Sequence, residues 1–188
     1  MIFRVSIEKE AGFTLIELMA VVAIIAILSA LAYPGFEKNR QKSVAKSISY
    51  NFYNALQSAK AEAIKKGLSV GIEVNPANRE VVSFINGDQD LAFDTAVDIV
   101  LARFPYSAED GFSYLSNATT WTTPTQTLRV FLNSKGEASV DLGSGKQSIC
   151  DLRGGEALFR VRSDNDTSAG LPFWYEMVVT CMGAARIK

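Results

Sequence analysis

A long apolar run near the start of the chain restricts the fold more than any other feature of the sequence. It extends from Phe13 to Tyr33 within the segment GFTLIELMAVVAIIAILSALAYPGF, and Glu17 is its only charged residue. A helix of about 20 apolar residues is long enough to cross the hydrocarbon core of a bilayer, which is about 30 Å thick. The run therefore predicts one membrane-spanning helix at residues 13–33.

The residues that flank this run distinguish a retained membrane anchor from a secretory signal. A secretory signal has a shorter apolar core, with a small-residue cleavage site behind it. Here the run continues directly into a polar helical pattern after Pro34, so we expect no cleavage on that side. The basic residues that follow are Lys38, Arg40, Lys42 and Lys46. Taken alone, the positive-inside rule would place them in the cytoplasm.

Glu17 is the candidate functional residue of the apolar run. A carboxylate in the hydrocarbon core is unfavourable by roughly 2.5–3.5 kcal/mol even on the most permissive insertion scale. Acidic residues inside a membrane are therefore rare, and most have a specific partner. The alternative is a glutamate whose side chain only extends to the headgroup region.

The residues around Gly12 resemble the processing site of type IV prepilins and of type II secretion pseudopilins. In that family a membrane-embedded aspartyl peptidase cuts after the glycine and N-methylates the new first residue. The glutamate four residues after Phe13 matches Glu17, and the proline twenty-one residues after it matches Pro34. The resemblance therefore implies a leader peptide at residues 1–12, cleavage between Gly12 and Phe13, and an N-methylated Phe13.

The resemblance also implies a role for Glu17. Cleavage would create an α-amine at Phe13, and this amine and the carboxylate are both unfavourable in hydrocarbon. Each can satisfy the other between neighbouring subunits, and in the family this pairing guides a subunit from the membrane into a growing filament. Glu17 and Pro34 are therefore the expected assembly residues.

Partners and location follow from the same resemblance. The expected partners are the prepilin peptidase, the inner-membrane assembly platform, and other minor and major pilins or pseudopilins. Before assembly, the single N-terminal helix would hold the chain in the inner membrane with its C-terminal domain in the periplasm, against the positive-inside rule. After assembly, the protein would lie in a pilus at the cell surface or in a periplasmic pseudopilus.

Helical periodicity continues beyond Pro34. A proline removes a backbone donor, and we expect it to kink the helix near this position without ending it. Apolar residues then recur every four positions, as on one face of an amphipathic helix. They are Val44, Ile48, Phe52 and Leu56. Basic residues and Gly67 end the pattern, so we expect one helix over 13–66 whose second half, 34–66, packs on a domain.

Residues 67–188 are expected to form an antiparallel β domain, which gives an α+β fold of the type IV pilin kind. The predicted strands are 70–74, 80–85, 96–104, 128–132, 137–142, 157–162 and 173–181. For 96–104 a short helix is the alternative. Residues 107–127 are rich in Ser, Thr, Asn and Pro, and they predict a long connection or a surface lobe.

The chain has two cysteines, Cys150 and Cys181. They would remain free thiols in the cytosol, whereas export would favour a disulfide between them. In the predicted last strand, Cys181 shares a face with Phe173, Tyr175, Met177 and Val179, which predicts that it lies against the core. We expect the disulfide, which closes a loop of about thirty residues and contributes about 3–4 kcal/mol.

The composition argues against catalysis and metal binding. The chain contains no histidine, which removes the commonest general base and the commonest zinc ligand. Its serines therefore have no histidine to activate them. The segment Asp164-Asn165-Asp166 has the acids of a calcium loop but lacks the glycine and glutamate of an EF-hand, so we interpret it as a turn. We expect no enzyme activity, no cofactor and no metal site.

Within the superfamily, the chain resembles the GspH/FimT group, which includes the FimU-type minor pilins. The resemblance rests on Phe52-Tyr53-Asn54-Ala55-Leu56 and on the segment from Phe131 to Gly136. It implies a minor pilin, a low-copy structural subunit that starts assembly near the tip of a type IV pilus and serves adhesion, twitching motility and DNA uptake. The alternatives are a GspH-like minor pseudopilin of a type II secretion system and a FimT-like DNA receptor for natural transformation.

The DNA-receptor alternative depends on the C-terminal residues. FimT-like DNA binders share a Gly-Arg-x-Arg element after the last strand, but here the segment is Gly183-Ala184-Ala185-Arg186. The formal net charge is −1, so no basic excess compensates for the missing arginine. If DNA is a partner, the expected contacts are Arg186 and Lys188, followed by Arg160 and Arg162. Otherwise Arg186 and Lys188 would be a solvated chain end.

Overall fold

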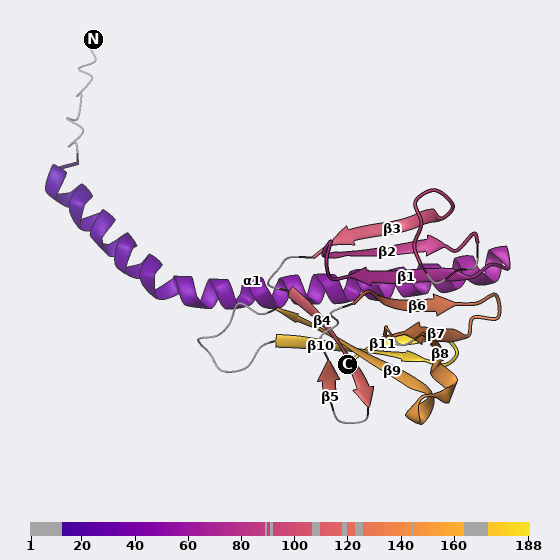
Figure 1. The fold of residues 1–188 in the computed structure, drawn as a ribbon. Helices are drawn as coiled ribbons and strands as arrows, with labels where there is room; N and C mark the ends of the chain where they lie inside the picture. The colour runs from indigo at the N-terminus through magenta and orange to yellow at the C-terminus, as the bar shows by residue number, and fades with distance from the viewer. Residues whose placement is uncertain are drawn as a thin grey trace, which may run out of the picture. The chain divides into compact units, whose positions relative to one another are not determined.

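The computed structural model describes residues 13–88, 90, 92–106, 110–117, 120–122, 126–143, 145–163 and 173–188. These residues form one long helix and two antiparallel β-sheets (Figure 1). The chain divides into two compact units, Met1–Asn39 and Arg40–Lys188. The predicted α+β class is therefore confirmed, with two sheets where the sequence indicated a single β domain.

The long helix, α1, extends from Leu15 to Lys66 without interruption. This confirms the predicted helix over 13–66 and shows that Pro34 does not end it. The kink near Pro34 stays a prediction. Within the first unit, the segment Leu15–Tyr33 has a mean hydropathy of 2.7 and none of it is buried, so it is long and apolar enough to cross a membrane.

The first sheet has six strands in the order β3-β2-β1-β6-β7-β8 (Figure 1). Its strands are β1 (Val70–Asn75), β2 (Glu80–Ile85), β3 (Ile99–Pro105), β6 (Leu128–Leu132), β7 (Ala138–Asp141) and β8 (Lys146–Ser148). The hairpin between β1 and β2 closes through the Asn75 side chain, whose Oδ1 accepts the backbone N–H groups of Ala77 and Asn78. An asparagine in this position stabilises a tight turn, as its sequence context indicated.

The second sheet has five strands in the order β11-β10-β9-β4-β5. Its strands are β4 (Asp110–Asn117), β5 (Thr120–Thr122), β9 (Glu156–Ser163), β10 (Phe173–Thr180) and β11 (Ala185–Ile187). Two short 3₁₀ helices, η1 (Ile149–Asp151) and η2 (Arg153–Gly155), connect β8 of the first sheet to β9 of the second. The chain therefore passes from one sheet to the other in this short segment.

The second half of α1 forms the centre of the core in the second unit. Ile48, Phe52 and Leu56 are buried, as the four-residue period predicted, whereas Val44 is only partly buried. The Phe52 ring lies 5.6 Å from Phe112 on β4 and 5.9 Å from Phe159 on β9, measured between ring centroids. Alanines on the same stripe let the sheets approach the helix closely: Ala55, Ala59 and Ala63.

The prediction of a long connection at 107–127 is wrong, because this region contributes β4 and β5. Phe112 and Tyr114 lie two residues apart on β4, and Phe112 is buried in the core. Ser113 lies between them, and the many Ser, Thr and Asn residues of this region obscured the alternation. The strand predicted at 96–104 begins three residues later, at Ile99, because an Asp94-bonded turn precedes it.

The C-terminus also differs from the prediction, because the strand at 173–181 is not the last. It is β10, which ends at Thr180, and β11 pairs with it antiparallel after a tight turn. Gly183 in that turn has φ 63°, and a Cβ there would lie 2.6 Å from the backbone oxygen of Gly136. Only glycine combines this backbone conformation with so close an approach. The short strands β8 and β11 carry too few apolar residues for the sequence to reveal them.

Removing the Phe52 ring should destabilise the second unit more than any surface change on α1. We expect Phe52→Ala to lower the free energy of unfolding by about 3–5 kcal/mol, because it leaves a cavity between Phe112 and Phe159. The neighbouring and half-exposed Tyr50 gives a control, since Tyr50→Ala should change it by about 0.5 kcal/mol or less. Urea titration of the full chain in detergent micelles, followed by tryptophan fluorescence, measures both values. Equal losses would contradict a core centred on Phe52.

Candidate functional site

The N-terminal end of α1 holds Glu17 in a local hydrogen-bond network. The Oε2 atom of Glu17 accepts the backbone N–H and the hydroxyl of Thr14, both at 3.0 Å. In return, the Glu17 backbone N–H donates to the Thr14 Oγ1 at 3.3 Å. Since α1 begins at Leu15, this is a capping box, in which a threonine and a glutamate three residues later satisfy each other's backbone groups. The sequence Thr14-Leu15-Ile16-Glu17 carries this signal, and the sequence reasoning missed it.

The capping box does not use all the acceptor capacity of Glu17. An ionised carboxylate offers about four lone-pair sites, and Thr14 occupies two of them. The carboxylate can therefore accept a further partner, such as an amine, without leaving the cap. Phe13 precedes the helix and is exposed, whereas Gly12 and its bond to Phe13 lie outside the described residues.

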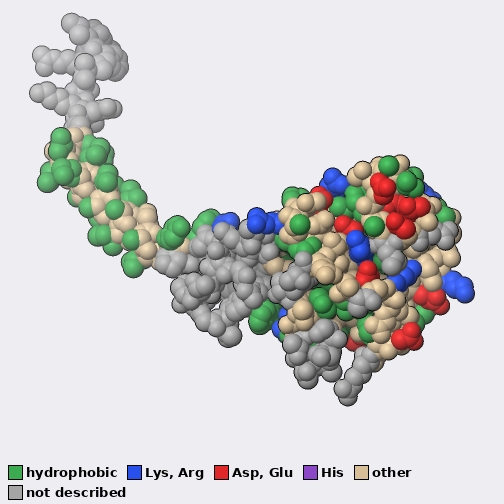
Figure 2. Space-filling view, viewed as in Figure 1, with side chains coloured by type: hydrophobic (Ala, Val, Ile, Leu, Met, Phe, Trp, Pro, Cys, Tyr) green, Lys and Arg blue, Asp and Glu red, His purple; other side chains and the backbone are tan. Residues whose placement is uncertain are grey.

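The apolar first half of α1 presents side chains that nothing in its own unit covers. Every residue from Leu15 to Tyr33 is exposed, and Figure 2 shows hydrophobic side chains along this segment. Apolar surface of this extent needs lipid or other protein chains around it. The side chain of Pro34, at the end of the segment, lies outside the described residues.

Cys150 and Cys181 form a disulfide, with their Cα atoms 4.7 Å apart. Cys150 lies on η1, and Cys181 lies in the turn between β10 and β11. The prediction that Cys181 faces the core from a strand is wrong. Its chain has already left β10 there, so Cys181 is only partly buried, and its partner Cys150 is exposed. The disulfide therefore fastens the surface segment between the sheets to the C-terminal turn.

Of the candidate DNA contacts, Arg160 has other partners. Its guanidinium lies over the Trp121 ring at 3.7 Å and the Trp174 ring at 4.5 Å, and its Nε donates to Glu176 at 3.0 Å. The side chain is only 19% exposed. Its charge is thus used within the second sheet, through cation–π contacts and an ion pair. Arg162 lies on β9, as Arg160 does, and is the cross-strand neighbour of Trp174 on β10. The side chain of Arg162 lies outside the described part of the chain.

Arg186 and Lys188 belong to the end of the second sheet and not to a free chain end. Arg186 lies on β11, and its guanidinium contacts the Glu156 carboxylate at 3.1 Å while remaining 59% exposed. The backbone N–H of Lys188 donates to the carbonyl of Glu176. Arg186 also borders a shallow hollow of about 340 Å³ between α1 and β11, lined with Tyr50 and Tyr53. Of the predicted contacts whose side chains are described, Arg160 and Arg186 are each paired with a glutamate and do not form an unpaired basic patch.

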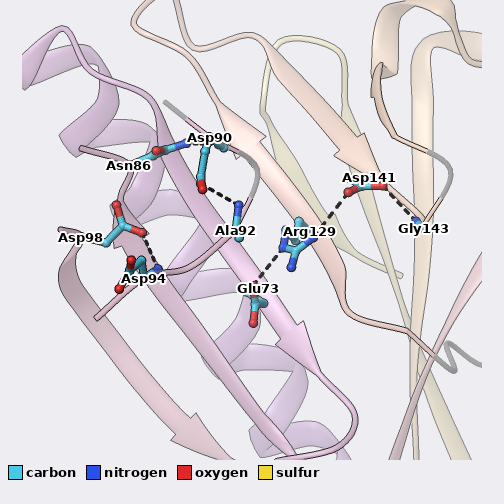
Figure 3. A network of polar contacts seen from close by, with 9 residues as sticks. All are labelled: Glu73, Asn86, Asp90, Ala92, Asp94, Asp98, Arg129, Asp141 and Gly143. Atoms are coloured by element: carbon cyan, nitrogen blue, oxygen red, sulfur yellow. Dashed lines mark hydrogen bonds and ion pairs between the residues drawn. The ribbon is translucent and has the colours of Figure 1, made fainter. Parts of the chain in front are cut away.

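A charged triad that the sequence reasoning missed crosses the first sheet (Figure 3). Arg129 on β6 lies between Glu73 on β1, at 2.9 Å, and Asp141 on β7, at 3.5 Å. The three residues are direct cross-strand neighbours, and both carboxylates are buried. Removing Arg129 would leave two buried acids unpaired, which is strongly unfavourable.

The connection between β2 and β3 contains a second polar network, which is also drawn in Figure 3. The carboxylate of Asp98 accepts the backbone N–H groups of Gly87 and Asp94, both at 2.9 Å, and fastens the loop back on itself. Asp90 and Asp94 each accept the backbone N–H two residues later. Among the described residues, no three Asp, Glu, Cys or His side chains come together as metal ligands would.

Comparison with known proteins gives one family model and two curated relatives. Residues 8–33 match the prokaryotic N-terminal methylation motif. The type IV major pilin protein PilA of Myxococcus xanthus is 33% identical over 118 residues, which cover 58% of this chain and 54% of PilA. The prepilin peptidase-dependent protein D of Escherichia coli is 53% identical over 36 residues, 19% of this chain and 25% of that protein. The chain thus spans about half the length of one relative and a quarter of the other.

Two solved structures also resemble this one. The type IV minor pilin FimU of Pseudomonas aeruginosa gives a TM-score of 0.46 at 13% identity, covering 81% of this chain and 90% of FimU. The minor pseudopilin EpsH of the Vibrio cholerae type 2 secretion system gives a TM-score of 0.48 at 14% identity, covering 78% of this chain and 94% of EpsH.

We expect every molecule to carry the disulfide and both cysteines to contribute to stability only through this one bond. We expect the unreduced protein to take up no alkylating reagent, and the reduced protein to take up two equivalents by intact-mass measurement. Cys150→Ser should lower the free energy of unfolding by about 3–4 kcal/mol. The double variant Cys150→Ser/Cys181→Ser should lose no more than either single variant, because the partners share one bond. Two thiols that alkylate without reduction would contradict the disulfide.

The ion pairs of Arg160 and Arg186 lead us to expect weak DNA binding at most. Each phosphate contact contributes about 0.9 to the slope of log affinity against log salt, and paired arginines contribute less because the carboxylate competes. A mobility-shift titration of the full chain in detergent should therefore show no micromolar binding at physiological salt. Micromolar binding that Arg186→Ala abolishes, and that Lys135→Ala in the turn between β6 and β7 leaves intact, would contradict this expectation.

Proposed function

We propose that the chain is a member of the type IV pilin-like superfamily and a minor pilin, a low-copy structural subunit that starts assembly near the tip of a type IV pilus. One observation carries the proposal: a single helix has an apolar first half that nothing covers and a second half buried in a folded domain. A subunit of this kind can be held in a membrane and then transferred to a filament core, because both surround the first half with apolar groups.

Processing would precede assembly. We propose that the prepilin peptidase removes the leader at residues 1–12, cuts between Gly12 and Phe13, and leaves N-methylated Phe13 at the start of the mature chain. The remaining parts are then the membrane or filament-core segment 13–33, the amphipathic helix 34–66 and the globular domain 67–188. The partners in this scheme are the inner-membrane assembly platform and the other minor and major pilins.

The disulfide supports a periplasmic location for the C-terminal domain. Disulfides form and persist in oxidising compartments such as the bacterial periplasm, and are rare in the cytosol. The Cys150–Cys181 bond therefore favours export of the domain, against the orientation that the basic residues after Tyr33 indicate. In the proposed pathway the protein lies in the inner membrane before assembly and at the cell surface afterwards.

Two other functions compete with this proposal. A minor pseudopilin of a type II secretion system would use the same anchored helix and exported domain, and the FimT-like DNA receptor is the third candidate. A deletion strain scored for twitching, protein secretion and DNA uptake separates the three. Loss of twitching with intact secretion would support the pilus, whereas loss of secretion alone would overturn it in favour of the pseudopilus.

The charge of Glu17 should matter for assembly, independently of its role in the helix cap. Glutamine at the same position also completes a capping box, so Glu17→Gln keeps the cap and removes the charge. We expect this variant, like Glu17→Ala, to be cleaved and N-methylated but to enter filaments poorly, because the new amine at Phe13 loses its counter-charge. Immunoblotting of sheared filaments against whole cells measures incorporation.

Two further variants serve as controls for the Glu17 experiment. Thr14→Ala removes the cap and keeps the carboxylate, so we expect it to assemble like the wild type. Gly12→Val should block cleavage, because a side chain there obstructs the scissile peptide. If Glu17→Gln assembled normally while Thr14→Ala failed, Glu17 would act through helix capping and the charge-pairing account would be wrong.

A further inference from the structure

The two sheets have four outer strands, and β3 differs from the other three. The strands β5, β8 and β11 have three residues each, whereas β3 has seven. Short edge strands and charged side chains protect a sheet from pairing with other chains. β8 and β11 follow this rule, with Lys146 and Arg186 respectively. The first half of β3 has neither protection.

The exposed apolar side chains of β3 lie on both faces of the sheet. Ile99 is 61% exposed and Val100 is 43% exposed, and Val97 just before the strand is 49% exposed. Ile99 pairs with Ile85, which belongs to the core under α1, while Val100 pairs with Phe84, which packs against Phe93 in a separate cluster. Directly opposed residues share a face, so Ile99 and Val100 point to opposite faces of the sheet.

This arrangement favours one kind of partner. A helix or a membrane surface laid on one face of the sheet would cover either Ile99 or Val100 and leave the other exposed. A strand added along the edge, in the plane of the sheet, would continue both faces and cover both side chains. It would also satisfy the outward backbone N–H and C=O groups that an edge strand presents.

The free part of the edge is short and well defined. The pairing of β2 with β3 shifts register at Leu101, which produces a β-bulge there. Beyond the bulge, Arg103 contacts Glu80 at 3.6 Å and Pro105 lacks a donor. Before the strand, the backbone N–H groups of Val97 and Asp98 donate to the carbonyl of Asp94 in a turn. The apolar strand residues that remain open to a partner are therefore Ile99 and Val100.

The residues beside this stretch define the charge of the partner. Residues 86–98 contain four aspartates and no lysine or arginine. Asp88, Asp90 and Asp94 are exposed, while Asp98 is buried and its carboxylate accepts the backbone N–H groups of Gly87 and Asp94. Figure 2 shows acidic side chains gathered on this side of the domain. An acidic border complements a partner that carries basic residues.

We propose that β3 binds, at Ile99 and Val100, an extended segment of a neighbouring pilin-like subunit, which pairs with β3 as an added strand. The segment carries apolar side chains on both of its faces and has Lys or Arg beside the loop 86–98. The inference rests on the proposed function, because it takes the neighbour to be another subunit of the same filament.

Site-specific photo-crosslinking in intact cells tests the proposal directly. We place p-benzoylphenylalanine at Ile99, with Met182 as the control because it is equally an exposed apolar residue of the second unit. We expect a crosslink from position 99, and not from 182, to a sequenced peptide of another protein that carries the N-terminal methylation motif. That peptide should be extended and flanked by Lys or Arg. A crosslink to a second copy of this chain, to a helix, or to nothing would overturn the proposal.

Charge and edge variants give an independent measurement. Val100→Lys should lower the crosslink yield from position 99 about tenfold or more, because a charge on the edge opposes strand addition. Met182→Lys should leave the yield unchanged. Replacing Asp88, Asp90 and Asp94 with Asn should also lower it, and a Lys→Glu change in the crosslinked peptide should do the same. A yield unaffected by all three loop changes would contradict the charge argument.

Failure of this inference and failure of the proposed function have different signatures. If the wild-type chain is absent from sheared filaments, the minor-pilin function is wrong, while the crosslink from position 99 still reports on the edge. If the chain is present in filaments but position 99 gives no crosslink to a subunit, the edge proposal is wrong and the function stands. A native disulfide in each variant, checked by alkylation, confirms that the domain has folded.

Discussion

The burial of one stripe of α1 against two sheets is the interaction on which the rest of the second unit depends. The sheets share no strand, so they are held together by what lies between them. Phe52 contacts aromatic rings of the second sheet, while Leu56 and Ala59 belong to the same buried cluster as Val70 and Val130 of the first. Burying a large apolar side chain contributes about 1.5–3 kcal/mol. The second half of the helix is therefore the common core of both sheets. Its apolar first half is not buried by either sheet and needs apolar surroundings of another kind.

The turn after β10 is the second place where the parts of this unit meet. The carbonyl of Met182 accepts a hydrogen bond from the Lys60 side chain of α1. The carbonyl of Cys181 accepts the backbone N–H of Ala138 on β7, and the N–H of Cys181 donates to the carbonyl of Gly155 on η2. The disulfide joins the same turn to η1. Four elements thus converge on Cys181–Gly183, where Gly183 permits the contact with the chain at Gly136. Loss of the disulfide would loosen the only covalent tie among them apart from the backbone, which explains why a partly exposed bond matters.

Much of this architecture could be predicted from the sequence because its signals are local. The period of four from Ile48 to Leu56, the turn at Asn75 and the hairpin of β6 and β7 each depend on neighbouring residues. The strand β4 could not be predicted in this way, since Phe112 becomes a core residue only through its contact with Phe52, sixty residues earlier in the chain. For the same reason the pairing of Arg160 with Trp121 and Trp174 was not visible, and the sequence left Arg160 as a free cation. Long-range pairing decides such roles, and no short window contains it.

The helix cap explains how the charge of Glu17 is accommodated before the proposed assembly. A bare carboxylate in hydrocarbon is unfavourable by several kcal/mol, but here the N-terminus of α1 offers it both the Thr14 donors and the positive end of the helix dipole. Both lower the free energy of the subunit while it waits in the membrane. They also hold the carboxylate beside the residue that becomes the new N-terminus, with acceptor sites still open. In this account the cap stabilises the carboxylate before assembly. Pairing of the carboxylate with the amine of a neighbouring subunit then needs no rearrangement of the helix.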